Sequence, residues 1–363
     1  MWGKFPTEVD HCRPFAKMRW SLYEEGPESD VVFTTRVRLA RNVAGIPFPG
    51  KASPQDLHLI LDKTRNLFTS TPLAFAELRS LSALQRRAML EAHVVSPKLT
   101  EHRSTAAVAY SEDGRLSVMI NEEDHIRIQA MEPGCQTREA WSSANALDDF
   151  MSRNLPYAFD PELGYLTSHV ANLGTGMRVS VMVHLPALKM LGRLPSVLDA
   201  AQRLDVAVRG LHGENTASTG SLYQVSNRYG IGKSETDILT EVEAVVKHLI
   251  ANERSARHRL YKEQRLNMED AVWRAYGVLS YARSISSEEA LEMLSCLRLG
   301  QLLEIVPING GLLKRLMLVI QPGMLQTIVG PVYSPSERDR KRADALRFAI
   351  TRGELESLGN CPI

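Results

Sequence analysis

Arginine is the residue that most clearly suggests chemistry in this 363-residue chain, because it recurs in or at the end of apolar segments. Four segments share the pattern, and they contain Arg36 with Arg38, Arg127, Arg178, and Arg209. An arginine that leaves open solvent needs an anionic partner, and its planar fork matches phosphate oxygens. Acidic residues occur nearby, so surface or salt-bridged arginines are the simpler interpretation of any one segment. The four segments together favour a polyphosphate site.

Two glycines precede one of these arginines. Gly174 and Gly176 lie in a loop that leads into Arg178, and residues 179–184 then alternate with the period of a strand. Glycines allow backbone amides to approach an anionic ligand closely, and an arginine at the loop exit would complete such a site. An ordinary turn before a strand is an equally good interpretation of the glycine pair alone.

Two carboxylates accompany the arginines. Glu123 shares the parity of Arg127 in an expected strand over 116–128, and Glu214 follows Arg209 in an expected turn. Each could align a cationic substrate and accept its proton, or could instead pair with the adjacent arginine. The histidines show no metal-ligand spacing, so no protein metal site is predicted. The chain contains no GxSxG, GxGxxG or GxxxxGK[ST] motif, which disfavours a serine hydrolase and the common nucleotide-binding loops.

The elements that must position these residues can be read from periodicity. Strands are expected over 31–39, 116–128, 179–184, 205–210 and 221–226, and helices over 57–68, 81–93, 138–153, 196–204, 234–264, 286–299, 312–320 and 337–351. The pattern predicts an α+β fold, with a mainly antiparallel sheet flanked by helices and followed by a helical C-terminal domain. We expect a lead-in over 1–30, a catalytic domain over 31–255 and the helical domain over 256–363.

Composition limits the partners and the compartment. Lys+Arg 43 against Asp+Glu 42 leaves a net charge of +1, so no global field favours a nucleic acid or a membrane surface. Four scattered cysteines without a CxxC pair, and no apolar run near ~20 residues, favour a soluble protein of the reducing cytoplasm.

Five segments together resemble the phosphagen (ATP:guanidino) kinase family, in its bacterial branch of protein arginine kinases. They read TTRVRLARN, NEEDHIRIQ, GYLTSHVANLGTGMR, VMVHLPAL and VRGLHGE, and they occur in this order between about Asp30 and Arg352. The resemblance implies a kinase that uses ATP with Mg²⁺ and transfers the γ-phosphoryl group to arginine side chains of proteins. Free arginine or another small guanidine is the alternative acceptor.

The resemblance also implies roles for single residues. Arg36, Arg38, Arg127, Arg178 and Arg209 would hold the nucleotide phosphates, and His93 would lie near the nucleotide. Glu123 and Glu214 would orient the substrate guanidinium, with Glu123 the usual candidate base. The implied nucleotide-binding segments comprise Thr34, Thr35, Arg36, Val37, Arg38, His93, Arg127, Arg178, Val179, Ser180, Val181, Met182, Arg209, Gly210, Leu211, His212, Gly213 and Glu214.

Two features indicate the protein arginine kinase branch. About 30 residues precede the TTRVR segment here, where metabolic guanidino kinases carry a helical domain, and the resulting open site would admit a protein-borne arginine. Residues 338–343 match the branch's RDxxRA motif, which implies allosteric phosphoarginine binding by Arg338, Asp339 and Arg342. At helical spacing Arg338 and Arg342 could grip one phosphate. The branch further implies a homodimer through the C-terminal domain, an activator protein and a protease system.

One position departs from the family pattern. His169 stands where the family has a reactive cysteine, and Val170 and Ala171 replace a proline and a hydroxyl residue. A neutral imidazole could accept a hydrogen bond from the substrate guanidinium, whereas an imidazolium would repel it. We therefore expect an active kinase in which His169 is a weak or pH-dependent catalytic helper. The alternative is a pseudokinase that binds ATP or phosphoarginine for regulation.

Overall fold

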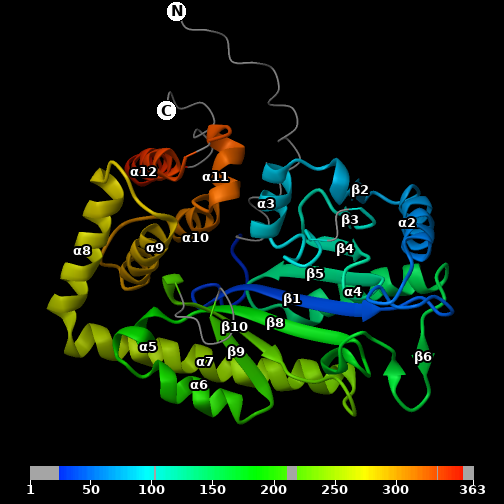
Figure 1. Ribbon diagram of the computed structural model, residues 1–363. Coiled ribbons are helices and arrows are strands. Elements are labelled where there is room, and N and C mark those ends of the chain that lie inside the picture. Colours follow the sequence, from blue (N-terminus) through cyan, green and yellow to red (C-terminus); the bar gives the residue numbers. More distant parts are fainter. Residues whose placement is uncertain (1–23, 102–103, 211–218, 333, 355–363) are drawn as a thin grey trace, which may run out of the picture.

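An eight-stranded antiparallel sheet organises the computed structural model, which describes residues 24–101, 104–210, 219–332 and 334–354. Its strand order is β2-β3-β4-β5-β1-β8-β10-β9 (Figure 1). The strands are β1 (Val32–Arg41), β2 (Ala74–Glu77), β3 (Ala107–Tyr110), β4 (Leu116–Ile120), β5 (Ile126–Pro133), β8 (Met177–His184), β9 (Val206–Gly210) and β10 (Leu222–Asn227). The central strand β1 pairs with β5 on one side and β8 on the other.

Helices cover the sheet face to which Val37, Val179 and Val181 point. Helix α4 (Thr137–Ser152) packs on β1 and β5, while α6 (Leu194–Gln202) and α7 (Glu235–Glu263) pack on the strands from β8 to β9. Because β side chains alternate between faces, the three valines enter the core while Arg36 and Arg38 point the other way. The predicted antiparallel sheet with flanking helices is confirmed.

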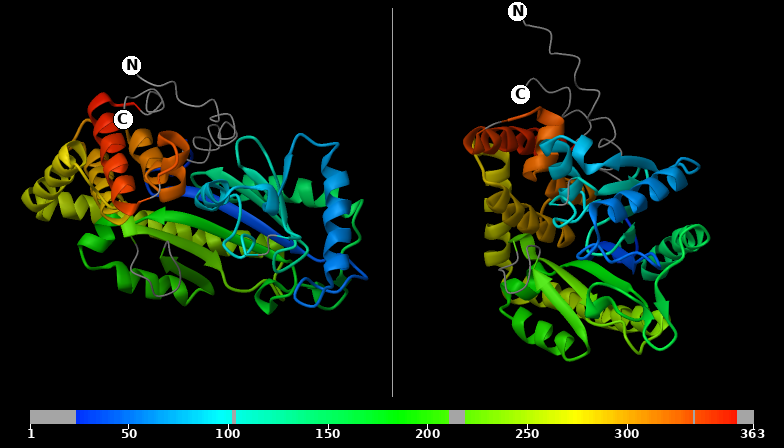
Figure 2. Two further views of the ribbon diagram at one scale, coloured as in Figure 1. Left: turned by 45° about the horizontal axis from the view of Figure 1, so that its top comes forward. Right: turned by 45° about the vertical axis from the view of Figure 1, so that its right-hand side comes forward.

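The C-terminal helices gather beside one end of the sheet (Figures 1 and 2). They are α8 (Arg265–Tyr281), α9 (Ser287–Leu302), α10 (Gly310–Val319), α11 (Pro322–Val329) and α12 (Pro335–Arg352). Helix α11 packs against α3 (Ala83–Glu91), and one apolar cluster continues from the sheet into α9, α10 and α12. Helix α7 runs unbroken through residue 256, where we expected a domain boundary. The expected domain limits remain predictions.

Within the described residues, no single helix is long and apolar enough to cross a membrane. Helices α10 and α11 reach that length and composition only as a pair that is bent by 98°.

The expected strand over 116–128 is wrong in one respect, because it is a hairpin. Strand β4 ends at Ile120 and β5 begins at Ile126, which faces it across the turn. Asn121 adopts φ 56°, a left-handed conformation that asparagine tolerates well, and its amide donates to the His125 carbonyl at 2.9 Å. Glu123 therefore lies in the turn and not within a strand.

Several short elements were not expected from the sequence. They are β2, β3, α5 (Pro186–Met190), α11 and the small hairpin of β6 (Phe159–Asp160) and β7 (Gly164–Tyr165), and the longer helix α8 was also not expected.

Candidate active site

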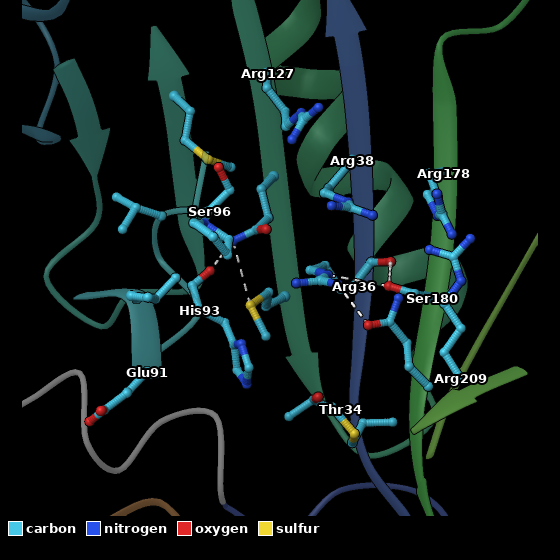
Figure 3. Close-up of a pocket in the computed structure, with 18 of the residues that line it drawn as sticks. Thr34, Arg36, Arg38, Glu91, His93, Ser96, Arg127, Arg178, Ser180 and Arg209 are labelled. Atoms are coloured by element: carbon cyan, nitrogen blue, oxygen red, sulfur yellow. Dashed lines mark hydrogen bonds between the residues drawn. The ribbon is translucent and has the colours of Figure 1, made fainter. Parts of the chain in front are cut away.

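Cross-strand register brings the arginines together on the open face of the sheet. Arg38 of β1 lies opposite Gln129 of β5 and Arg178 of β8. Arg36, one step along the same face, lies opposite Met131 and Ser180. Figure 3 shows Arg127, Arg38, Arg36, Arg178 and Arg209, which come from β5, β1, β8 and β9 of the one sheet. A strand places every second side chain on one face, so residues distant in sequence form one cationic surface.

These side chains line a cavity of about 880 Å³. The predicted site residues that line it are Thr34, Arg36, Arg38, His93, Glu123, Arg127, His169, Arg178, Ser180, Met182, Arg209 and Gly210. Nucleotide-binding residues predicted from several separate segments thus meet the described acceptor residues in one pocket.

Other predicted site residues lie elsewhere. Val37, Val179 and Val181 are fully buried on the opposite sheet face, and Thr35 donates its hydroxyl to the Gly134 carbonyl at 2.7 Å. Strand alternation directs these four side chains away from the pocket. Leu211, His212, Gly213 and Glu214 fall outside the described residues.

Arg36 and Arg38 lie at the centre of the arginine cluster. Arg36 donates to Ser180 Oγ and Gln224 Oε1, both at 3.2 Å, and these acceptors are neutral. Burial, followed by the charges of Arg178 and Arg127, lowers the pKa of Arg36 to about 10. Burial and the neighbouring arginines also lower the pKa of Arg38 well below its ordinary value, and its buried Nε has no hydrogen-bond partner. Such a surface is suited to a polyanion.

Arg127 connects the cationic surface to two carboxylates of the β4–β5 turn. Its guanidinium pairs with Glu122 at 2.5 Å and with Glu123 at 2.9 Å. Glu122 is buried and also accepts a hydrogen bond from the Ser96 hydroxyl. Sequence reasoning missed Glu122, although it precedes Glu123 in the NEEDHIR segment. It orients Arg127.

Glu123 lies among three cationic or titratable neighbours. Oε1 is 2.7 Å from Lys98 Nζ and 3.2 Å from His169 Nε2. Partial burial raises the pKa of Glu123, but the Lys98 hydrogen bond and the charges of Arg127 and His169 outweigh it and leave the pKa below its ordinary value. Glu123 is therefore ionised at neutral pH and ready to hold a cation. Lys98 was not anticipated from the sequence.

The loop that carries His169 is tied to the same turn. The Ser168 amide donates to Asp124 Oδ1 at 2.7 Å, and the Ser168 hydroxyl donates to the Glu123 carbonyl at 2.7 Å. The His169 side chain is 59% exposed, so an incoming substrate can reach it. The departure at this position therefore places an imidazole directly beside the candidate base.

The two loop glycines serve the packing of the loop itself. A Cβ on Gly174 would lie 2.8 Å from the Gly230 carbonyl oxygen, and one on Gly176 would lie 2.6 Å from the Ala40 carbonyl oxygen. Both glycines also have positive φ, which other residues rarely adopt. Gly176 lines the pocket, whereas the close approach at Gly174 is to protein backbone.

His93 is held at the pocket wall in an unusual backbone conformation. Its φ is 60°, and its carbonyl accepts a hydrogen bond of 2.7 Å from Gln129 Nε2. Burial and the charge of Arg36 lower the pKa of His93 to about 4, so the ring is neutral at physiological pH. A neutral ring can pack against a nucleotide without adding charge.

The RDxxRA segment lies on α12, far along the chain from the arginine cluster. Arg342 is buried and donates to the Ile320 carbonyl at 2.8 Å and the Ile285 carbonyl at 2.9 Å. It also pairs with Asp339. Arg342 thus joins α12 to the start of α9 and the end of α10, and Arg338 and Asp339 are the more accessible members of the motif. The expected binding of phosphoarginine by Arg338, Asp339 and Arg342 stays a prediction.

Comparison with known proteins places this site in a family. Residues 59–256 match the ATP:guanido phosphotransferase C-terminal catalytic domain, and residues 265–358 match the protein-arginine kinase McsB C-terminal domain. A protein-arginine kinase of Caldanaerobacter subterraneus is 40% identical over 90% of this chain and 99% of its own length. One of Pelotomaculum thermopropionicum is 43% identical over 89% and 93%.

Solved structures support the same fold. Lombricine kinase superposes with a TM-score of 0.55 at 23% identity, covering 66% of this chain and 70% of that one. A duplicated taurocyamine kinase from Schistosoma mansoni gives 0.58 at 22% identity, covering 65% and 34%. The antiparallel sheet, both matched domains and the full-length relatives agree, so the chain belongs to the ATP:guanido phosphotransferase family, in its protein-arginine kinase branch, as an ATP-dependent phosphotransferase that acts on a guanidino nitrogen.

Proposed function

We propose that this chain transfers the γ-phosphoryl group of ATP to arginine side chains of proteins, with the phosphates on the arginine cluster and the acceptor guanidinium at Glu123. The observation that carries the proposal is the placement of the ionised Glu123 beside Arg127, at one end of a cationic surface on which Arg36 donates to the neutral Ser180 and Gln224. One end can thus hold a cation while the remainder holds a polyanion.

The reaction can be followed atom by atom. A guanidino nitrogen attacks the γ-phosphorus, an N–P bond forms, and the bond from phosphorus to the ADP oxygen breaks. A guanidinium is too weakly acidic to lose its proton beforehand, so the proton passes to a carboxylate as the N–P bond forms. Glu123 is the described carboxylate in position for this role, while Glu214 lies outside the described residues.

Positioning and charge neutralisation supply most of the catalysis in phosphoryl transfer. Arg36, Arg38 and Arg178 would hold phosphate oxygens, and Arg127 would bridge the γ-phosphate and the Glu123 carboxylate. Mg²⁺ would enter with the nucleotide, since it ordinarily keeps several waters and is held by phosphate oxygens, and it would neutralise their charge. Exposed Lys98 and His169 are the neighbours of Glu123 that an incoming guanidinium can displace at least cost.

One assay tests the proposal. Incubation with MgATP and an arginine-rich unfolded protein should yield acid-labile phosphoarginine, detected by mass spectrometry. Free arginine in a parallel reaction tests the small-guanidine alternative. ATP binding without product on either acceptor, at any pH through the histidine range, would reject the kinase proposal.

A pseudokinase is the second candidate, and the His169–Glu123 contact favours it. An imidazolium at this place would occupy the carboxylate that the substrate needs. In that case the chain would bind ATP or phosphoarginine and act through its C-terminal domain. We favour the active enzyme because the sequence keeps all five arginines assigned to the phosphates and both glutamates, Glu123 and Glu214, assigned to the acceptor.

Further partners remain proposals. We propose phosphoarginine sensing at Arg338, Asp339 and Arg342, a homodimer through the C-terminal helices, cytoplasmic location, and action with an activator protein and a protease system. Membership of the protein-arginine kinase branch supports each of these proposals, and the exposed apolar side chains of α8 support the dimer.

A further inference from the structure

The nucleotide pocket has a wall that comes from the helical C-terminal region. Leu291 of α9, Met317 and Leu318 of α10, and Gln321 between α10 and α11 line the same cavity as the arginines. All four lie within the segment that matches the protein-arginine kinase C-terminal domain, and none lies within the matched catalytic domain. The cavity is therefore built by both parts of the chain.

A specific contact holds this wall in place. Glu91, at the end of α3, accepts hydrogen bonds of 2.8 Å from the Gly323 and Met324 amides, the first turn of α11. A Cβ on Gly323 would lie 2.7 Å from Arg87 Cγ and 3.0 Å from the Ala88 amide nitrogen. Glycine thus permits α11 to approach α3 closely. Leu318 and Met324 also share an apolar cluster with Met89 and Val108.

The direction of a bound nucleotide follows from the proposed function. Residues on one face of a strand recur about every 6.6–6.8 Å, so Thr34 lies well over 10 Å along β1 from Arg38 and farther from Arg127, which faces Ala40. If Glu123 receives the acceptor, the γ-phosphate lies at the Arg127 end. The base must then point toward Thr34 and Met182, which are neighbours in the sheet.

The chemistry at that end suits a nucleobase. Met131, Met182, Met317 and Leu318 supply apolar and polarisable surface, and His93 is neutral. Gln321 is partly exposed, and its Nε2 makes a long hydrogen bond of 3.3 Å to the Met317 carbonyl. A carboxamide offers a donor and an acceptor side by side, which matches the amino group and ring nitrogen of adenine.

We infer that the C-terminal helices form the adenine subsite, with Met317 and Leu318 against the base and Gln321 as a positioning residue on its polar edge. The C-terminal region then takes part in nucleotide binding itself. The inference rests on the proposed function, because that function sets the direction of the nucleotide.

The test compares ATP with tripolyphosphate, which carries the phosphates without the base. Binding to full-length protein is measured by calorimetry for the wild type, Gln321→Ala and the control Gln326→Ala. Gln326 is the same residue type on α11, and it bonds Pro322 and Val332 but does not line the cavity. We expect Gln321→Ala to weaken ATP binding roughly three- to tenfold and to leave tripolyphosphate binding unchanged, with no effect of Gln326→Ala.

A second measurement needs no variant. In the wild type, ATP should slow hydrogen exchange of the backbone amides in 318–324, and tripolyphosphate should not. The adenine subsite would be overturned if Gln321→Ala weakened the binding of ATP and tripolyphosphate equally, or weakened neither. It would also be overturned if both ligands slowed hydrogen exchange in the wild type equally. The kinase proposal would stand in each of these cases. If the wild type binds neither ligand, the proposed function fails first and the subsite fails with it.

Discussion

At the scale of single residues, Glu123 is held by Lys98, Arg127 and His169 in a way that separates fixed from replaceable contacts. Arg127 is itself anchored by the buried Glu122, whereas Lys98 and His169 are 46% and 59% exposed. A substrate guanidinium can therefore take the place of an exposed partner and keep Arg127 in position. The charge of Glu123 is what makes this exchange favourable.

Replacing Glu123 by Gln should nearly abolish phosphoryl transfer. The amide keeps the shape of the side chain but can neither accept the proton nor hold a cation, so we expect a loss of about 10²–10⁴-fold in rate. ATP affinity should stay within a few-fold of the wild type. Phosphoarginine formation and ATP binding measure the two effects, and exposed Glu139 on α4 provides the matched Glu→Gln control. A variant with near-normal turnover would remove Glu123 from its proposed role.

His169 should compete with the substrate for Glu123. Its Nε2 lies 3.2 Å from Glu123 Oε1, and a protonated imidazole at this place would bind the carboxylate and repel the substrate guanidinium. Asparagine cannot take up a proton, so His169→Asn should keep more activity than the wild type in acid. Rates of the two proteins at about pH 6 and 8 measure this effect, and Glu123 stays ionised at both because its pKa lies below its ordinary 4.5. The same ratio of rates at both pH values would show that His169 is not the inhibiting group.

At the scale of elements, serine caps in the sequence predicted where several helices begin. Ser53 with Asp56 and Ser234 with Asp237 form the capping boxes of α2 and α7, and Ser286 caps α9. Alternation likewise predicted β1 with the two arginines on one face. The turn at 121–125 was missed although its five consecutive polar residues interrupt the alternation of the flanking strands. The left-handed conformation of Asn121 is visible only in three dimensions.

The residues of the pocket were predictable only where a local sequence pattern marks them. The arginine segments and Glu123 carry local patterns, and the family resemblance assigns them roles. Glu122, Lys98 and the wall formed by Met317 and Gln321 depend on contacts between distant elements, which periodicity does not report. Arg342 shows the same limit, because its motif suggests a ligand contact but does not report its hydrogen bonds to two backbone carbonyls.

The contact between β8 and α9 should make stability depend on pH. His184 is fully buried, and its Nε2 lies 2.8 Å from Ser295 Oγ. Burial, then the charges of Arg298, Arg257 and Lys189, lower its pKa well below the ordinary 6.5. As pH falls, His184 takes up a proton in the unfolded chain before it does so in the folded protein. The stability that the neutral, buried His184 contributes is therefore complete above pH 6.5. It is lost progressively below that pH, by up to about 1.4 kcal/mol per pH unit.

Urea unfolding at a series of pH values measures this effect. His184→Gln should be less stable than the wild type at neutral pH, and the difference between the two free energies of unfolding should shrink as pH falls below 6.5. A constant difference across that range would mean that His184 accepts a proton in the folded state as readily as in the unfolded state.

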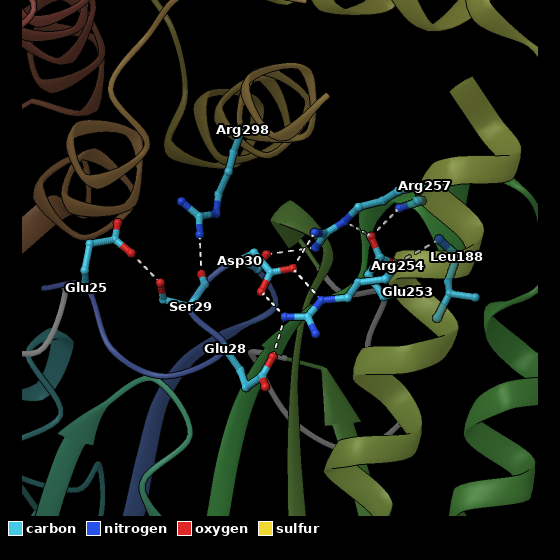
Figure 4. A network of polar contacts seen from close by, with 10 residues as sticks. Glu25, Glu28, Ser29, Asp30, Leu188, Glu253, Arg254, Arg257 and Arg298 are labelled. Atoms are coloured by element: carbon cyan, nitrogen blue, oxygen red, sulfur yellow. Dashed lines mark hydrogen bonds and ion pairs between the residues drawn. The ribbon is translucent and has the colours of Figure 1, made fainter. Parts of the chain in front are cut away.

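At the scale of the whole molecule, the segment before β1 joins the two parts of the chain (Figure 4). Asp30 pairs with Arg254 and Arg257 of α7 at 2.6 and 2.9 Å, and Arg298 of α9 donates to the Ser29 carbonyl. Two residues later β1 begins, and it carries Arg36 and Arg38 into the pocket. The C-terminal helices are therefore connected to the arginine strand through this segment as well as through the pocket wall.

The outer face of α8 supports the proposed dimer and allows a direct test. Leu266, Trp273 and Tyr281 are 78%, 50% and 74% exposed, and their spacing of seven and eight residues places them along one side of the helix. A stripe of this kind favours association with another surface, and a second copy presents the same stripe. Trp273→Glu would place a charge at its centre, and the loss of a buried aromatic anchor ordinarily costs about 2 kcal/mol or more, or roughly 30-fold in dimer dissociation.

Sedimentation equilibrium over a range of concentrations should show a dimer for the wild type and a shift toward monomer for Trp273→Glu. Leu204→Glu is the matched control, because Leu204 is 58% exposed and lies outside α8. That variant should remain dimeric. Because Trp273 lies outside the nucleotide pocket, ATP binding by the Trp273→Glu monomer should persist, which separates assembly from folding. An unchanged dimer in both variants would place the subunit interface on another surface of the chain.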